Sequence, residues 1–170
     1  MEFRLLKANE IDCRIGRMNE RGLTLLLYKD ARVDQAILDE TVGAMNWQRH
    51  HSRDNANCVV SIWDKEKGQW IEKEDTGTES NTEKEKGLAS DSFKRACVNW
   101  GIGRELYTAP FIWVSAADTE IKKDAKGKLK CNDLFFVEQI LYDDSRSIVA
   151  LSIKNERTGK RVFLVDKRKK

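Results

Sequence analysis

The sequence predicts an α+β fold, in which an antiparallel β-sheet made of a hairpin plus a meander packs against two helices, one of them long. Two observations predict it. Most of the chain consists of short apolar or alternating segments between turn residues, and only two segments have the three- and four-residue apolar spacing of a helix. These segments do not alternate regularly as strand and helix, so a parallel sheet is not expected.

The first two predicted strands form a hairpin. Ile11, Cys13 and Ile15 alternate with polar residues, which is typical of a half-buried strand. The turn residues NERG follow, and LTLLLY then supplies the second strand.

A first helix is predicted over 31–42. Asp30 stands before it as an N-terminal cap, and Gly43 follows it as a stop. We expect its inward-facing stripe to consist of Val33, Ile37 and Thr41.

A three-stranded meander is predicted next, from NWQRHHS, NCVVSIW and QWIEKE, with a KEKG turn between the last two. It carries Trp47, Trp63 and Trp70. The polar stretch DTGTESNTEKEK is expected to be a loop that leads into the long helix.

The long helix has one apolar side and one charged side, because helical residues turn by about 100° each. The core-facing stripe is Ala89, Phe93, Ala96, Cys97 and Trp100. The far side carries Lys84, Asp91, Lys94, Arg95 and Val98. Gly101 ends the helix, and the adjacent cations Lys94 and Arg95 stand out among small and apolar neighbours.

The C-terminal third is predicted to be a buried strand at FIWV and a second meander made of LFFVEQILY, SIVALSI and RVFLVD. We expect a mobile, lysine-rich excursion over 115–132 and a frayed basic tail over 167–170. The length of 170 residues suits a single domain over 1–170.

Composition excludes some classes of protein. With 40% hydrophobic and 35% charged residues the chain is globular, and no apolar run approaches the ~20 residues of a membrane span. The four cysteines are isolated, which favours buried reduced thiols over a metal site or disulfides. A net charge of +3 is too small to indicate a nucleic-acid partner, so any basic surface must arise from clustering.

Two motifs that resemble catalytic sites have simpler interpretations. GIGREL follows a helix instead of opening one, so its glycines are interpreted as a helix stop and not as a phosphate-binding loop. His50 and His51 are neighbours on a strand and point to opposite faces, so they do not form one metal site. We therefore expect no catalytic residue, metal or cofactor.

The remaining signal is a set of cations on the predicted elements: Arg14, Arg17, Lys29, Arg32, Lys94 and Arg95. If the helices cover one face of the sheet, these side chains line one concave side and suit a nucleic acid. Ordinary solvation of polar faces explains them equally well.

The segment from Asp75 to Tyr107 resembles the Rad fifty-two/twenty-two family of DNA single-strand annealing proteins. DTGTES precedes EKEKGLASDSFKRACVNWGIGRELY, which matches the family's helix with an acid, an apolar residue before a Lys-Arg pair, and an aromatic-glycine stop. The matching positions are Asp91, Phe93, Lys94, Arg95, Ala96, Trp100 and Gly101. Upstream, Tyr28, Arg32, Val33, Gly43 and Trp47 take the places of the family's tyrosine strand, helix and tryptophan strand.

The resemblance covers roughly Ile11 to Tyr107 and is closest to short phage and prophage members. It implies a βββα-like annealing core and ATP-independent binding and annealing of complementary single strands in recombination and repair. It also implies a homo-oligomeric ring, a phage exonuclease or single-strand-binding protein as partner, and the cytoplasm of a bacterial host. Pattern and resemblance together predict these DNA-binding residues: Lys94, Arg95, Arg14, Arg17, Lys29, Arg32, Lys84 and Arg104.

One position departs from the family. A further arginine one turn beyond the Lys-Arg pair is replaced here by Val98, and Arg104 is the candidate to compensate. Two alternatives stay open: a nucleic-acid-binding module for single or double strands that does not anneal, and a metal-dependent nuclease using Asp39, Glu40 or Asp75.

Overall fold

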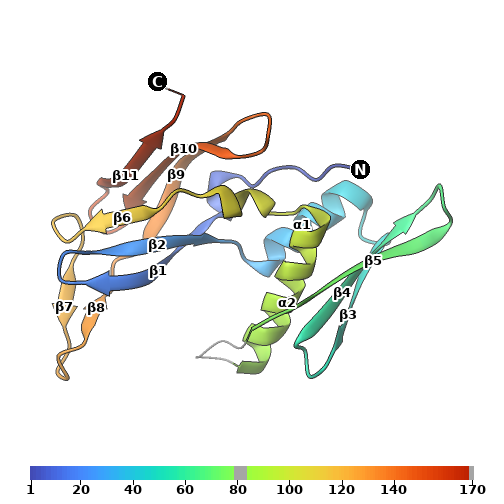
Figure 1. Cartoon of the computed structure of the whole chain (residues 1–170), viewed down its shortest axis with the longest axis horizontal. Coiled ribbons are helices and arrows are strands. Elements are labelled where there is room, and N and C mark those ends of the chain that lie inside the picture. The colour runs from blue at the N-terminus through green and yellow to red at the C-terminus, as the bar shows by residue number, and fades with distance from the viewer. Residues whose placement is uncertain (79–83, 169–170) are drawn as a thin grey trace. The chain divides into compact units, whose positions relative to one another are not determined.

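The structure is a computed structural model that describes residues 1–78 and 84–168, with side chains for all of these except 84–86 (Figure 1). Its contacts form two compact units. Unit 1 consists of Met1–Leu5 and Asp30–Arg104, and unit 2 of Leu6–Lys29 and Glu105–Lys170. The α+β class with antiparallel sheets and two helices is confirmed. The sequence predicted one domain and did not indicate this division.

Unit 1 contains a three-stranded antiparallel sheet and both α-helices. The sheet order is β3 (Trp47–Ser52), β4 (Asn57–Asp64), β5 (Gln69–Thr76). Helix α2 (Lys84–Trp100) packs on β4 and β5, and helix α1 (Ala31–Val42) contacts α2 and β3. The predicted meander and both helices are therefore present in this unit.

The core of unit 1 lies between α2 and the sheet. Phe93, Ala96 and Cys97 on α2 are fully buried, as the apolar stripe predicts. Phe93 stacks on Trp47 of β3, with ring centroids 6.1 Å apart. Trp100 is half-buried, and its indole N–H donates to the Val60 carbonyl of β4 at 3.0 Å. Full burial of an aromatic ring contributes ~1.5–3 kcal/mol, so the buried Phe93 ring stabilises the packing of α2 on its sheet.

Helix α1 begins and ends as predicted but buries a slightly different stripe. The Asp30 side chain accepts from the backbone N–H of Arg32, and Gly43 ends the helix with φ of 85°. The buried residues of α1 are Asp34, Ile37 and Leu38. The helix is thus rotated relative to the predicted stripe of Val33, Ile37 and Thr41, because Leu38 on the same side adds apolar area.

The chain between β5 and α2 lies very close to the helix. A Cβ built on Gly77 would lie 2.6 Å from the backbone nitrogen of Ser92, so only glycine fits. The next residue, Thr78, donates its backbone N–H to Asp91 at 2.9 Å. The rest of the predicted loop, 79–83, lies outside the described residues.

Unit 2 contains a six-stranded antiparallel sheet in the order β11-β10-β9-β1-β2-β6. Its edge strands β6 and β11 also contact each other, so the sheet curls toward a small barrel. The strands are β1 (Asp12–Asn19), β2 (Gly22–Tyr28), β6 (Ile112–Ser115), β9 (Phe135–Tyr142), β10 (Ile148–Asn155) and β11 (Arg161–Asp166). Two 3-10 turns, η1 (Ala8–Glu10) and η2 (Arg104–Thr108), precede β1 and β6.

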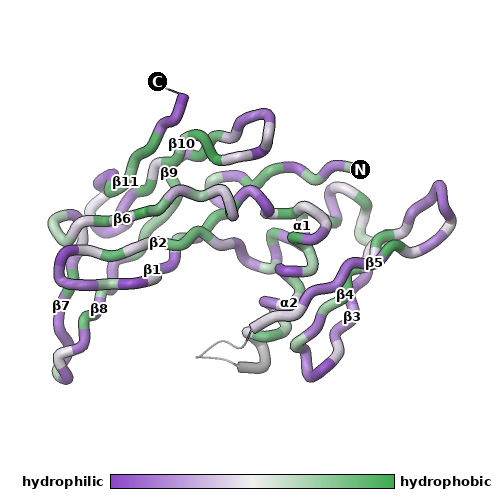
Figure 2. Tube along the Cα trace, in the orientation of Figure 1, coloured by the Kyte–Doolittle hydropathy of each residue, from purple (hydrophilic) through white to green (hydrophobic). Residues whose placement is uncertain are grey.

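Long stretches of β2, β6, β9 and β10 are hydrophobic in Figure 2. The barrel interior is filled by Leu23, Leu25, Ile112, Val114, Val137, Leu151 and Ile153, all buried. Because β1 pairs with β9, the predicted N-terminal hairpin joins the predicted C-terminal meander in one sheet. The prediction that the hairpin and the first meander share a sheet is therefore wrong.

The segment 115–132 contains a second hairpin in place of an unstructured excursion. Strands β7 (Ile121–Lys123) and β8 (Leu129–Cys131) form their own two-stranded sheet. No helix among the described residues is long and apolar enough to cross a membrane.

Candidate nucleic-acid interface

The Lys94–Arg95 pair lies on α2 away from the buried Phe93 and Ala96, as predicted. Both side chains are half-exposed. The Arg95 Nε lies 3.3 Å from the Asp75 Oδ1 of β5, and 43% of the Arg95 side chain stays exposed. The ion pair with Asp75 therefore orients the Arg95 side chain, which remains partly exposed to solvent.

A polar seam continues from this pair along the contact between α2 and β5. Lys73 donates to the Asn99 carbonyl at 2.9 Å and lies 4.7 Å above the Trp100 ring. Asn99 in turn donates its side-chain N–H to the Glu74 carbonyl at 2.8 Å. The seam joins the end of α2 to the edge strand, so the cations of α2 stand on a rigid support.

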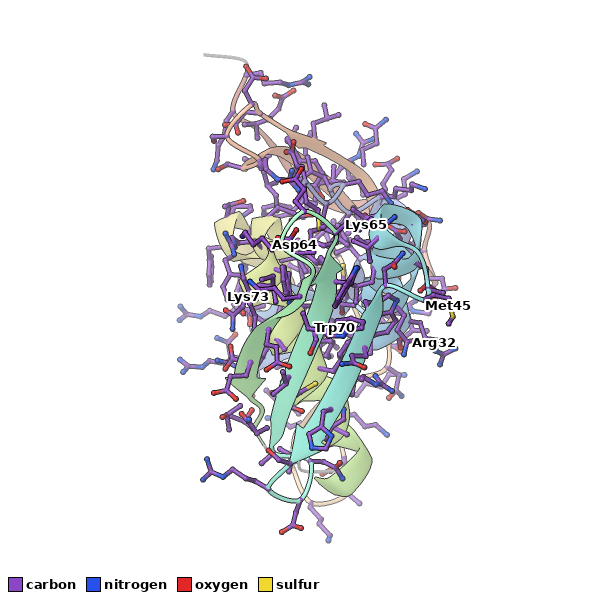
Figure 3. The ribbon with its side chains drawn as sticks, turned by 90° about the vertical axis from the view of Figure 1, so that its right-hand side faces the viewer. Arg32, Met45, Asp64, Lys65, Trp70 and Lys73 are labelled. Atoms are coloured by element: carbon purple, nitrogen blue, oxygen red, sulfur yellow. The ribbon has the colours of Figure 1, made fainter. Side chains whose placement is uncertain are left out.

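A cleft of about 370 Å³ opens beside the N-terminal end of α1. Its lining residues are Asp30, Ala31, Arg32, Gln35, Arg49, His51, Ala89 and Ser90. The Arg32 side chain is 89% exposed, and Figure 3 shows it reaching outward. Arg49 lies over the Phe93 ring at 4.7 Å. The cleft therefore has two guanidinium groups on its wall.

The histidine of this cleft is a weak base. Burial, followed by the nearby Arg49 charge, lowers the pKa of His51, so the neutral imidazole is favoured at neutral pH. Its Nδ1 lies 3.4 Å from the Ser92 Oγ, on the helix side of β3, whereas His50 is exposed. Arg49 is not among the predicted cations, although it alternates in phase with Trp47 and His51 and therefore lies on the same face of β3 as they do.

The face of β3–β4–β5 turned away from α2 is largely polar. Trp70, 38% exposed, lies on it in Figure 3 and packs edge-on against Trp63 with ring centroids 5.5 Å apart. Glu72 and Glu74 follow Trp70 in alternation on β5 and are exposed. Two carboxylates on this face disfavour it as a phosphate-binding surface.

In unit 2, Arg14 lies on the outer face of the six-stranded sheet. It pairs with Leu26, while Asp12 of the same strand pairs with Tyr28 on one side and Phe136 on the other. Leu26, Tyr28 and Phe136 are 54%, 41% and 44% exposed. The exposed rings of Tyr28 and Phe136 form a surface on which bases can stack, with the Arg14 cation and the Asp12 carboxylate on the same strand.

Among the predicted DNA contacts, Lys29 is buried, Arg104 is bonded to the end of α2, and the side chain of Lys84 is not described. Lys29 is only 4% exposed, so it does not present its ammonium group to solvent. Arg104 donates to the Val98 carbonyl at 2.9 Å and to the Asn99 carbonyl at 3.2 Å, which makes it a cap for the end of α2. Lys84 is the first residue of α2, and its side chain lies outside the described residues.

Arg17 is exposed at an irregular point of β1. The pairing with β2 shifts between Ile15 and Met18, and the Thr24 hydroxyl accepts from the Arg17 backbone N–H at 2.8 Å. Arg14, Arg17 and Lys29 belong to unit 2, whereas the other predicted cations belong to unit 1.

The glycines of GIGREL close α2. Gly101 and Gly103 have φ of 101° and 71°, and the Ile102 N–H donates back to the Cys97 carbonyl at 3.1 Å. A helix end presents carbonyl groups, which do not bind phosphate. The helix-stop interpretation is confirmed.

The carboxylates of the nuclease alternative have structural partners. Asp39 accepts from the Trp47 indole at 2.7 Å, and Glu40 pairs with Arg4. Asp75 pairs with Arg95. Within the described residues no group of three His, Cys, Asp or Glu side chains is arranged to hold a metal ion.

The four cysteines are free thiols. Burial raises the pKa of Cys13 to about 12 and of Cys58 to about 11, so neither is a reactive thiolate at neutral pH.

Comparison with known proteins identifies no relative: no family model, no curated protein and no solved structure matches the chain.

Proposed function

We propose that this protein binds single-stranded DNA and anneals complementary strands without nucleotide hydrolysis. The observation that carries the proposal is the Lys94–Arg95 pair, which stands on the exposed side of a helix whose other side is fixed to a three-stranded sheet. Cations on a rigid support hold phosphates while the bases remain available for pairing. The family resemblance of the segment around this pair supports the same function.

Two further groups extend the proposed surface. Arg32 and Arg49 on the cleft wall are additional cations of unit 1. Arg14 with Tyr28 and Phe136 is the candidate surface of unit 2. One copy of the chain offers only a short track of phosphate contacts, so we propose a homo-oligomer in which adjacent subunits extend it.

The direct test uses two variants and two assays. Lys94→Ala/Arg95→Ala is expected to lower the salt slope of single-strand binding, log Kd against log salt, by ~1.4, which is ~0.7 for each lost phosphate contact. The matched control, Lys65→Ala/Lys67→Ala, changes two exposed lysines on the β4–β5 turn and is expected to bind like the wild type. Fluorescence anisotropy with a labelled oligonucleotide measures both, and equal slopes in two folded variants contradict this site.

Annealing is separated from simple binding by a second measurement. Complementary labelled oligonucleotides are mixed without ATP, and their pairing is followed by energy transfer. An annealing protein accelerates pairing, whereas a module that only coats single strands slows it. Incubation of DNA with magnesium or manganese tests the nuclease alternative, for which we expect no cleavage.

A further inference from the structure

The β7–β8 hairpin, residues 121–131, concentrates positive charge. Its sequence IKKDAKGKLKC contains five lysines and one aspartate, a net charge of +4. The whole chain has a net charge of only +3, so this hairpin is more positive than the rest of the protein taken together. Because the net charge of the chain is small, a basic surface can arise only where cations cluster, and this hairpin is such a cluster.

The hairpin has one apolar face and one basic face. Ile121 pairs with Cys131, and Lys123 with Leu129; Ile121, Leu129 and Cys131 are half-buried. Lys122 and Lys130 pair on the opposite face, and Lys128 lies two residues before Lys130, just outside β8. Figure 2 shows both hydrophilic and hydrophobic residues along β7 and β8.

Two of the five lysines of the hairpin form ion pairs, and the other three form none with the residues that the structure describes. Lys122 and Lys123 pair with Glu120 and Glu20, at 2.9 and 2.7 Å. Lys126, Lys128 and Lys130 are exposed and form no ion pair with any described residue.

The charges of the hairpin repel each other in the free protein. Lys122 lies directly opposite Lys130, an arrangement that destabilises a strand pair. The one aspartate, Asp124, offsets only one of the five positive charges, and its Oδ1 accepts from the backbone N–H groups of Lys126 and Lys128. A bound anion removes this repulsion.

The base of the hairpin is rigid. Asp133, 5% exposed, follows β8 and accepts hydrogen bonds from Thr119 and from the Glu120 backbone N–H, at 2.9 and 3.0 Å, just before β7. It also accepts from Asn155 at 2.8 Å and pairs with Arg157. The basic face is therefore presented in a defined orientation relative to the barrel of unit 2.

We infer that the basic face of the β7–β8 hairpin binds the phosphate backbone of nucleic acid, as a contact separate from Lys94–Arg95; this inference rests on the proposed function. Lys128 and Lys130 are spaced by two strand residues, ~6.6–6.8 Å, which suits the regular charge spacing of a phosphodiester chain. The hairpin has no aromatic residue to stack on bases and no large apolar residue at its tip to enter a bilayer. It therefore contacts backbone only, and binds both single strands and duplexes irrespective of sequence.

The test compares two variants of equal charge change. Lys126→Gln/Lys128→Gln/Lys130→Gln removes the unpaired lysines, and Lys7→Gln/Lys65→Gln/Lys67→Gln removes three exposed lysines elsewhere. For the hairpin variant we expect the salt slope of single-strand binding to fall by ~2.1, which is ~0.7 for each of three lost contacts, so that wild type loses ~18-fold more affinity than the variant between 50 and 200 mM salt. Duplex binding weakens in the same variant, and the control variant behaves like the wild type.

The outcomes separate this inference from the proposed function. If the wild type binds and anneals DNA and the two triple variants have equal salt slopes, the hairpin inference is overturned and the proposed function stands. If the wild type binds neither single strands nor duplexes, both fail. If it binds vesicles of phosphatidylcholine and phosphatidylserine through the hairpin but no nucleic acid, the partner is an anionic membrane and the inference is also overturned.

Discussion

The hydrogen-bonded carboxylate of Asp133 offers a measurable test of how the base of the β7–β8 hairpin is held. Asp133→Asn keeps the shape of the side chain but removes its charge and turns one acceptor atom into a donor. Donors from Asn155 or Arg157 then face another donor. Removing one partner of a buried ion pair costs ~3–5 kcal/mol.

The expected loss lies at the low end of this range, about 3 kcal/mol, because half of the Arg157 side chain is exposed and regains water. For a chain of this length such a loss lowers Tm by roughly 6–12 °C. Thermal and urea unfolding followed by circular dichroism measure it. The matched control is Asp144→Asn, which makes the same chemical change on an exposed side chain and is expected to alter stability by less than ~0.5 kcal/mol.

The pH dependence provides an independent check on the same carboxylate. The hydrogen bonds from Arg157, then those from the Glu120 backbone, Asn155 and Thr119, hold the pKa of Asp133 well below its ordinary value. In the acid range the unfolded chain therefore binds more protons than the folded one. The stabilisation is fully present above the ordinary carboxyl pKa of about 4 and is lost as the pH falls below it.

The difference in unfolding free energy between wild type and Asp133→Asn should accordingly shrink between pH 5 and pH 3. Glu138, whose pKa is lowered to about 2 chiefly by the hydrogen bond from Arg161, acts in the same direction in both proteins and cancels in the comparison. An equal difference at pH 7 and pH 3, or a variant as stable as Asp144→Asn, would refute the electrostatic account.

Two further predictions concern unit 1. Trp100→Phe keeps the ring but removes the indole N–H that donates to β4, so urea unfolding should show a loss of about 1 kcal/mol; an unchanged midpoint contradicts the value given to that hydrogen bond. Gly77→Ala places a Cβ 2.6 Å from the Ser92 backbone nitrogen and should destabilise the protein by ~1–3 kcal/mol, and a variant that melts like the wild type would show that this loop moves away from α2 without cost.

Local features of the fold were predictable from the sequence. Alternation located the strands at Cys13 and Ile15, and three- and four-residue spacing identified Phe93 and Ala96 as core, because these patterns depend only on neighbouring residues. The pairing of Asp12 with Phe136 depends on residues far apart in the chain, and no local pattern encodes it. The division of the chain into two units follows from this pairing.

The candidate site was predictable to a smaller extent. The exposed position of Lys94 and Arg95 follows from the helical period. The burial of Lys29 and the capping by Arg104 depend on which groups the fold brings beside them, and a cation looks the same in sequence whether it is solvated or bonded. The hairpin at 121–131 was missed because strands of three residues are shorter than any periodic signal.

The way the chain alternates between the two units has a consequence for folding during synthesis. Unit 1 has all of its residues once Arg104 has left the ribosome. The β1–β2 hairpin is synthesised before unit 1 is complete. Its two edges pair with β6 and β9, which are synthesised only after residue 104. Until then its apolar strand LTLLLY has no barrel to enter and is open to pairing with another chain. Slow elongation after residue 104 should therefore increase aggregation of nascent chains, while changes that delay unit 1 should have little effect on it.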